Sequence, residues 1–78
     1  MPHVIIKMYP GRTEAQKQEL CDRIVKDVME VAGCGEDTIS LGIEEIPKED
    51  WAKTVYKPDI LDRKGTLYKL PGYNPFGD

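Results

Sequence analysis

Cysteine and histidine are scarce in this chain, and their scarcity excludes two common ways of stabilising a small protein. The 78 residues include two cysteines, Cys21 and Cys34, and one histidine, His3. Two cysteines cannot form a disulfide framework, and their positions relative to His3 do not match the spacing of a metal site. We therefore expect no metal, with Cys21 a small buried or half-buried residue on a helix and Cys34 in a loop.

Long apolar runs and clusters of basic residues are also missing. The longest apolar run, Val4–Ile6, is far shorter than the roughly 20 residues of a membrane-spanning helix or the core of a secretory signal. The 14 acidic and 11 basic residues are interspersed and give a net charge of −3, without the basic stripe typical of nucleic-acid-binding proteins. We predict a cytoplasmic protein with neither a membrane nor a nucleic acid as its partner.

The length of the chain predicts a single domain over residues 1–78. A chain of this size buries only about 60% of the surface that it exposes when unfolded, so it needs additional stabilisation. With disulfides and metals excluded, association between subunits is the source that remains. We expect a homo-oligomer and favour a dimer.

The first part of the sequence predicts a strand followed by a capped helix. Residues 4–9 include three consecutive β-branched residues, which favours a strand that is buried on both faces. Thr13 and Gln16 have the spacing of a capping box, so a helix is expected to begin after Thr13. Gly33 is expected to end this helix. Its apolar stripe is predicted at four positions with helical spacing: Leu20, Ile24, Val28 and Val31.

A second strand is predicted over residues 38–46, where Ile39, Leu41 and Ile43 alternate with smaller or polar residues. The connection over residues 10–37 accommodates a helical crossover, which joins parallel strands. We therefore predict an α+β fold built on a βαβ unit with parallel strands. Because two strands do not make a stable sheet alone, we expect dimerisation to extend it to four strands with two helices on one face.

The pattern changes after residue 46. Pro47 fits the first position of a short helix, and Trp51, Val55 and Tyr56 supply its apolar side. Pro58 is expected to interrupt this helix, because proline lacks an N–H group and its ring clashes with the preceding turn. Residues 59–78 predict a helical turn, a short extended or hairpin segment, and a loose tail.

Pro2 is the residue that points to chemistry. Removal of Met1 is expected because the next residue is small, and the chain would then begin with a secondary amine. Free α-amino groups titrate at about 7.7–8.0. An apolar pocket or a nearby cation lowers that pKa toward neutrality, where a general base works best. Proline is common enough that its position could be accidental, so Pro2 alone does not decide the function.

Three other residues stand at positions where they could contribute to a site. Arg12 directly precedes the predicted helix, and both a guanidinium and a helix amino end attract anions; the alternative is a solvated loop arginine. Trp51 is the only tryptophan, and by itself it fits a core or interface anchor. His3 is expected to be a surface histidine.

Together these features resemble the 4-oxalocrotonate tautomerase family, and among its members the longer, dimeric subgroup. The resemblance rests on the Met1-Pro2-His3 start before a Val/Ile strand and on the segment Gly11-Arg12-Thr13-x-x-Gln16-Lys17. A second strand at the family's distance, Trp51, and the closing Lys69-Leu70-Pro71-Gly72-Tyr73 add to it. The resemblance implies a tautomerase/MIF-like fold and an enzyme, an isomerase, that needs no cofactor.

The resemblance also implies roles for four residues. Pro2 would be the general base in keto–enol tautomerisation of a small enol or 2-oxo acid. Arg12 would bind the substrate carboxylate, and Trp51 would form a wall of the pocket. Ser40 stands where the family has a second arginine, and it can offer one neutral hydrogen bond instead of a charge-assisted one. A monocarboxylate substrate is therefore favoured over a dicarboxylate.

Two other functions stay open. Relatives with this scaffold resemble hydratases, dehalogenases or decarboxylases in which a protonated proline is the general acid, although those reactions generally need further charged residues around the pocket. A small dimeric binding module without catalysis is the remaining alternative. If Met1 is retained, the Pro2 nitrogen is an amide without basicity, and the proline-based mechanism fails.

Overall fold

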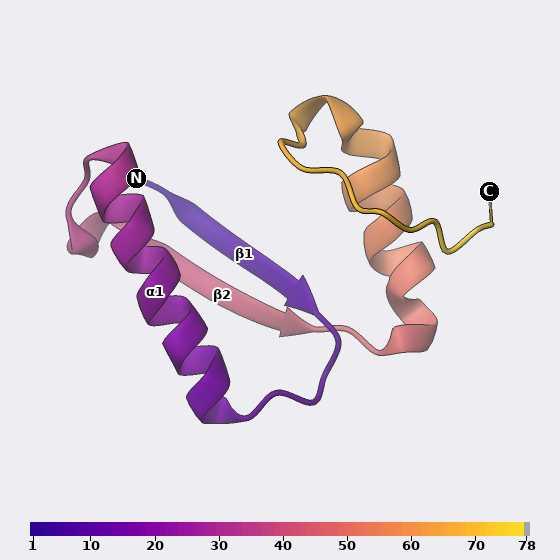
Figure 1. The fold of residues 1–78 in the computed structure, drawn as a ribbon, viewed down its shortest axis with the longest axis horizontal. Coiled ribbons are helices and arrows are strands. Elements are labelled where there is room, and N and C mark those ends of the chain that lie inside the picture. The colour runs from indigo at the N-terminus through magenta and orange to yellow at the C-terminus, as the bar shows by residue number, and fades with distance from the viewer. Residues whose placement is uncertain (78) are drawn as a thin grey trace. The chain divides into compact units, whose positions relative to one another are not determined.

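The computed structural model describes residues 1–77 of the chain (Figure 1). They divide into two compact units, one up to Glu45 and one from Ile46 onward. A single domain over the whole chain stays a prediction. The elements in chain order are β1 (His3–Met8), α1 (Glu14–Ala32), the 3-10 turn η1 (Glu36–Thr38), β2 (Ser40–Glu45), η2 (Lys48–Asp50), η3 (Ala52–Ile60) and η4 (Leu61–Thr66).

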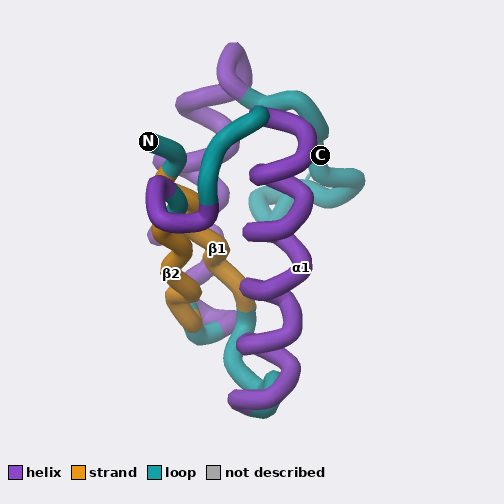
Figure 2. The backbone as a smooth tube through the Cα atoms, turned by 90° about the vertical axis from the view of Figure 1, so that its left-hand side faces the viewer, coloured by secondary structure: helices purple, strands orange, loops and turns teal. Residues whose placement is uncertain are grey.

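The first unit is a βαβ unit, as predicted. β1 and β2 pair in parallel, with the register running from His3 opposite Ser40 to Met8 opposite Glu45. Helix α1 connects the two strands and lies along one face of the sheet (Figure 2). β1 is shifted by one residue from the predicted range 4–9, and β2 is shorter at both ends than the predicted range 38–46. β2 begins later because residues 36–38 form the turn η1.

Helix α1 begins and ends where the local sequence predicts. The Thr13 side chain accepts a hydrogen bond from the Gln16 N–H at 3.1 Å, and the Thr13 N–H donates to Gln16 Oε1 at 2.9 Å. This reciprocal pair is the predicted capping box. At the other end Gly33 has φ 69°, and its N–H donates to the Met29 carbonyl. The left-handed backbone at Gly33 explains why glycine ends the helix.

The sheet has one face toward α1 and one open face. Leu41 and Ile43 line a groove together with Cys21 of α1, so these two residues face the helix. Their register partners in β1, Val4 and Ile6, lie on the same face of the sheet. Ile5 belongs to the opposite face and is 51% exposed. The expected burial of the first strand on both faces is therefore wrong for the single chain, because the first unit has only one long helix and it covers only one face.

The predicted apolar stripe of α1 is correct except at its last position. Leu20, Ile24 and Val28 are half-buried, whereas Val31 is 89% exposed. The helix has 19 residues and each strand has six. At about 1.5 Å per helical residue and about 3.3 Å per strand residue, the helix is longer than the strands that it covers. Part of α1 therefore extends beyond the strands.

The second unit is helical in its first part and irregular in its last. Val55 and Tyr56 of η3 are only 4% and 6% exposed and form its core, as expected. Pro58 does not interrupt the helix, so that prediction is wrong: η3 is a π-helix that contains Pro58 and runs to Ile60. The proline ring clashes with the carbonyl four residues earlier in an α-helix, and the wider π-helical turn changes that spacing.

Two smaller expectations for the second unit are also wrong. Pro47 is the N-cap of the short turn η2 rather than its first helical residue. Of the two alternatives for the segment after η4, extended or hairpin, the hairpin is wrong, because residues 67–77 contain no strand. Within this segment the chain instead turns back on itself at residues 74–77, where the Gly77 N–H donates to the Asn74 carbonyl at 3.2 Å.

Candidate active site

Pro2 lies directly before β1 and is half-buried. Its carbonyl accepts a hydrogen bond from the Ser40 N–H at 3.2 Å, so the parallel pairing of the two strands begins at Pro2. Met1 precedes it and is fully exposed. The Pro2 carbonyl is therefore fixed by a hydrogen bond to β2, whereas the Pro2 nitrogen is bonded only to the exposed Met1. Removal of Met1, which is expected, would leave this nitrogen as a free amine.

His3 and Ser40 meet beside Pro2. They are register partners at the start of the two strands, and His3 Nδ1 lies 2.6 Å from Ser40 Oγ. Either group can be the donor, depending on which ring nitrogen of His3 carries a proton. His3 is exposed, as predicted, but its contact with Ser40 was missed. Parallel register is the signal that could have revealed it, since it places the residue after Pro2 opposite the start of the second strand.

Arg12 lies in the loop between β1 and α1. It follows Gly11, whose φ of 128° is one that other residues rarely adopt, and it precedes the N-cap Thr13. The guanidinium is exposed and makes no hydrogen bond or ion pair with any other residue of the described range 1–77. A free cation beside a helix amino end can bind an anion.

Pro2 and Arg12 lie at opposite ends of the first unit. Pro2 precedes β1, and Arg12 is reached only after β1 has ended at Met8 (Figure 1). A strand of six residues spans about 20 Å at roughly 3.3 Å per residue. We therefore expect a small substrate at Pro2 to lie out of reach of Arg12 of the same chain.

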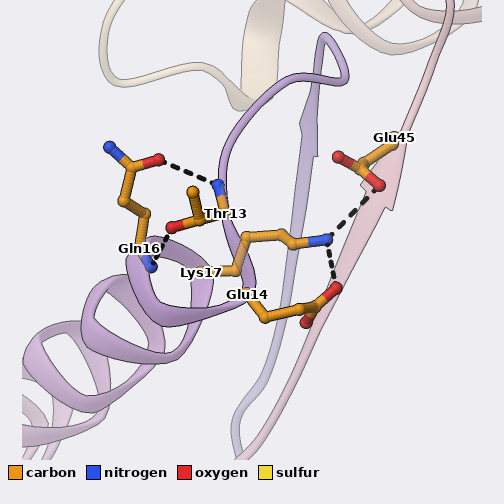
Figure 3. A network of polar contacts seen from close by, with 5 residues as sticks. All are labelled: Thr13, Glu14, Gln16, Lys17 and Glu45. Carbon is orange, nitrogen blue, oxygen red and sulfur yellow. Dashed lines mark hydrogen bonds and ion pairs between the residues drawn. The ribbon is translucent and has the colours of Figure 1, made fainter.

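An ion-pair network lies at the start of α1, directly after the loop that carries Arg12. The Nζ atom of Lys17 lies 3.0 Å from Glu14 and 3.3 Å from Glu45, and the Lys17 side chain is only 17% exposed (Figure 3). Its hydrogen bond with Glu14 is the main cause that raises the pKa of Lys17, and the one with Glu45 adds to it, while partial burial acts in the opposite direction. The network connects the first turn of α1 to the end of β2.

Trp51 belongs to the second unit, directly after η2. It is half-buried, and its Nε1–H donates a hydrogen bond to the Tyr73 hydroxyl at 2.7 Å. The sequence predicted the tryptophan as a pocket wall but not this contact, because 22 residues separate the two side chains.

Neither a metal site nor a membrane span is found in the part of the chain that the structure describes. No group of three or more His, Cys, Asp or Glu side chains gathers there in a way that could hold a metal ion. No helix in residues 1–77 is long and apolar enough to cross a membrane. Cys21 and Cys34 are both half-buried free thiols, on α1 and in the following loop respectively.

Comparison with known proteins identifies the family. A family model described as "Tautomerase enzyme" matches residues 2–55. The chain belongs to the tautomerase family. A "Probable tautomerase" of Xylella fastidiosa (strain 9a5c) is 42% identical over 73 residues, which cover 94% of this chain and 89% of that relative. The "2-hydroxymuconate tautomerase" of Bacillus subtilis (strain 168) is 40% identical over 52 residues, covering 67% of this chain and 84% of that relative.

A solved structure supports the same assignment. The crystal structure of YwhB, described as a homologue of 4-oxalocrotonate tautomerase, is 40% identical to this chain and has a TM-score of 0.59. The match covers 60% of this chain and 77% of that one. This tautomerase is therefore an enzyme of the isomerase class, and its βαβ unit has the fold of the 4-oxalocrotonate tautomerase family.

Proposed function

We propose that this tautomerase interconverts the enol and keto forms of a small 2-oxo monocarboxylate, with the amine of Pro2 as general base. The observation that carries the proposal is the position of Pro2, half-buried at the start of β1 with its carbonyl bonded to the Ser40 N–H. Because that hydrogen bond fixes the backbone of Pro2, the amine left by removal of Met1 has a fixed position and orientation. Defined geometry is the first requirement of a general base.

The proposed reaction moves one proton from oxygen to carbon. The Pro2 nitrogen takes the proton of the enol hydroxyl, and the electrons of the O–H bond form the new C=O bond. The electrons of the C=C bond then take the proton from the prolyl ammonium and form a C–H bond next to the carbonyl. The amine is regenerated, so the reaction needs no cofactor.

Arg12 is proposed to bind the substrate carboxylate with a bidentate, charge-assisted contact. Because the whole of β1, about 20 Å long, lies between Pro2 and Arg12 in one chain, we propose that the two residues that serve one substrate come from different copies. The sheet of one chain has only two strands, β1 and β2, so each has one edge without a neighbouring strand within the described residues. We propose that the active form is a homo-oligomer, with a symmetric dimer as the simplest case.

Ser40 and Trp51 are proposed to define which acid is accepted. The amino ends of the two strands offer a hydroxyl and an imidazole rather than a second guanidinium. A second carboxylate placed there would lack a bidentate partner, which favours a monocarboxylate. Trp51 is proposed as an apolar wall of the substrate pocket. A cytoplasmic location is part of the same proposal.

The test is ultraviolet-monitored ketonisation of a phenylenolpyruvate-like acid by protein whose intact mass lacks methionine. A correctly processed Pro2→Ala variant should be slower by about 10²–10⁴-fold, the usual contribution of general-base catalysis. A protein that carries one extra residue before Pro2 is the second variant. It keeps every side chain but turns the Pro2 amine into an amide, so it should be equally slow. Undiminished activity in both variants would exclude the amine as the base.

A further inference from the structure

The indole of Trp51 is attached to the core of the second unit through Tyr73. Its Nε1–H donates to the Tyr73 hydroxyl at 2.7 Å, and the Tyr73 ring lies against that of Tyr56 with centroids 5.7 Å apart and planes at 46°. Tyr56 is 6% exposed. Tyr73 thus bridges a buried ring of η3 and a tryptophan that precedes this helix.

The chain after Tyr73 reinforces this arrangement. The Phe76 ring packs edge-on against Tyr56, with centroids 5.7 Å apart and planes at 69°. The turn between them is closed by Asn74, whose Oδ1 accepts a hydrogen bond from the Phe76 N–H at 2.9 Å. Tyr73 and Phe76 therefore contact the same buried ring from one short segment. Tyr68, five residues earlier, is fully exposed.

We propose that Tyr73 is a positioning residue of the active site, which fixes the orientation of the Trp51 indole. The inference rests on the proposed role of Trp51 as a pocket wall. The indole N–H is a donor with no acceptor capacity, so one well-placed acceptor selects one orientation of the ring. Tyr73 acts through Trp51 and not on the reacting atoms, so its loss should weaken substrate binding without slowing proton transfer.

The fluorescence of Trp51 allows this contact to be measured without any enzyme assay, because the chain has no other tryptophan. Tyr73→Phe removes the acceptor and keeps the ring that packs on Tyr56. We expect a shifted emission maximum and stronger acrylamide quenching than in the wild type. KM for a monocarboxylate enol should rise on the order of fivefold, the loss typical of one neutral hydrogen bond, with kcat unchanged. Tyr68→Phe is the matched control and should change none of these.

A double-mutant cycle separates positioning from general stability. In a Trp51→Phe background, Tyr73→Phe should have no further effect on KM, since the donor is already gone. The proposal is overturned if Tyr73→Phe leaves the emission and quenching of Trp51 unchanged, if it leaves KM unchanged, or if its effect on KM persists without the tryptophan. Failure of the proposed function is seen separately, as a wild-type protein that does not ketonise enol acids.

Discussion

His3 and Ser40 face each other across the two parallel strands, and the Nδ1 atom of His3 lies 2.6 Å from the Ser40 hydroxyl oxygen. The hydroxyl that stands where related enzymes are expected to carry an arginine is therefore already engaged within the chain. When Nδ1 carries no proton, the Ser40 hydroxyl must be the donor of this bond and has no second hydrogen to offer a substrate.

This relationship predicts an unusual effect of removing His3. In the tautomer in which Ser40 is the donor, His3→Ala frees its hydroxyl to donate to a substrate oxygen, so KM for a monocarboxylate enol should fall by about two- to tenfold, the range of one neutral hydrogen bond. An unchanged KM would mean that His3 is the donor of this bond. In a Ser40→Ala background the same substitution should leave KM unchanged. An equal effect of His3→Ala in both backgrounds would show that Ser40 takes no part in binding.

A second prediction concerns the charge of the substrate. Arg12→Ala removes a free cation, and the loss in kcat/KM should approach the roughly 1.5–3 kcal/mol of a hydrogen bond to a charged group. Ser40→Arg should improve a dicarboxylate such as a hydroxymuconate more than a phenylenolpyruvate-like acid. Both substrates are compared in wild type and in each variant. Unchanged kcat/KM values in Arg12→Ala would mean that the carboxylate is bound elsewhere.

The separation of Pro2 and Arg12 predicts that inactive variants complement each other. Pro2→Ala and Arg12→Ala are each expected to retain only a small fraction of the wild-type kcat/KM, about a tenth or less. If a dimer shares its sites, mixing and refolding them in equal amounts gives heterodimers in which one of two sites has both residues intact. Random pairing should restore about a quarter of wild-type activity. A mixture that is no more active than its components would contradict the shared site. It would mean that Pro2 and Arg12 serve a site within one subunit, or that they do not serve the same site.

The assembly itself can be checked independently of activity. Sedimentation equilibrium should give a dimer or a larger symmetric oligomer, because the edges of a two-stranded sheet stay unpaired in one chain. A folded monomer down the whole practical concentration range would contradict the shared site, whatever the complementation assay shows.

The Lys17 network predicts a pH dependence of stability. The pKa of Lys17 is raised in the folded protein by its bonds to Glu14 and Glu45, so the protonated form stabilises the fold. That contribution is fully present below the unfolded lysine pKa of about 10.4 and is lost as the pH rises through the higher folded value.

Urea unfolding of Lys17→Met should therefore show a destabilisation relative to wild type that is constant from neutral pH to about pH 10 and shrinks above it. Lys26→Met, an exposed position on the same helix, is the matched control and should differ little from wild type at any pH. A Lys17→Met difference that does not change between pH 9 and pH 11 would mean that packing of the aliphatic chain, not the ion pair, is responsible.

Several features of this tautomerase were determined by the local sequence alone. Helix α1 is bounded by a capping box and a glycine whose effects extend over only a few residues, so both ends could be predicted. The two strands and their parallel pairing followed from β-branched composition and from the length of the connection. Pro2 and Arg12 were recognisable as candidates because their chemistry depends on their place in the chain, before a strand and before a helix.

Other features were decided only by the tertiary structure. The contact between His3 and Ser40 depends on the register of the two strands, and a shift of one residue would abolish the contact. The passage of η3 through Pro58 depends on the wider π-helical turn. In the tail, which was expected to be loose, Tyr73 and Phe76 pack on Tyr56. These contacts join residues far apart in the chain, so no local pattern encodes them. The separation of Pro2 from Arg12 is likewise a consequence of β1 lying between them, and it makes a second copy of the chain part of the proposed site.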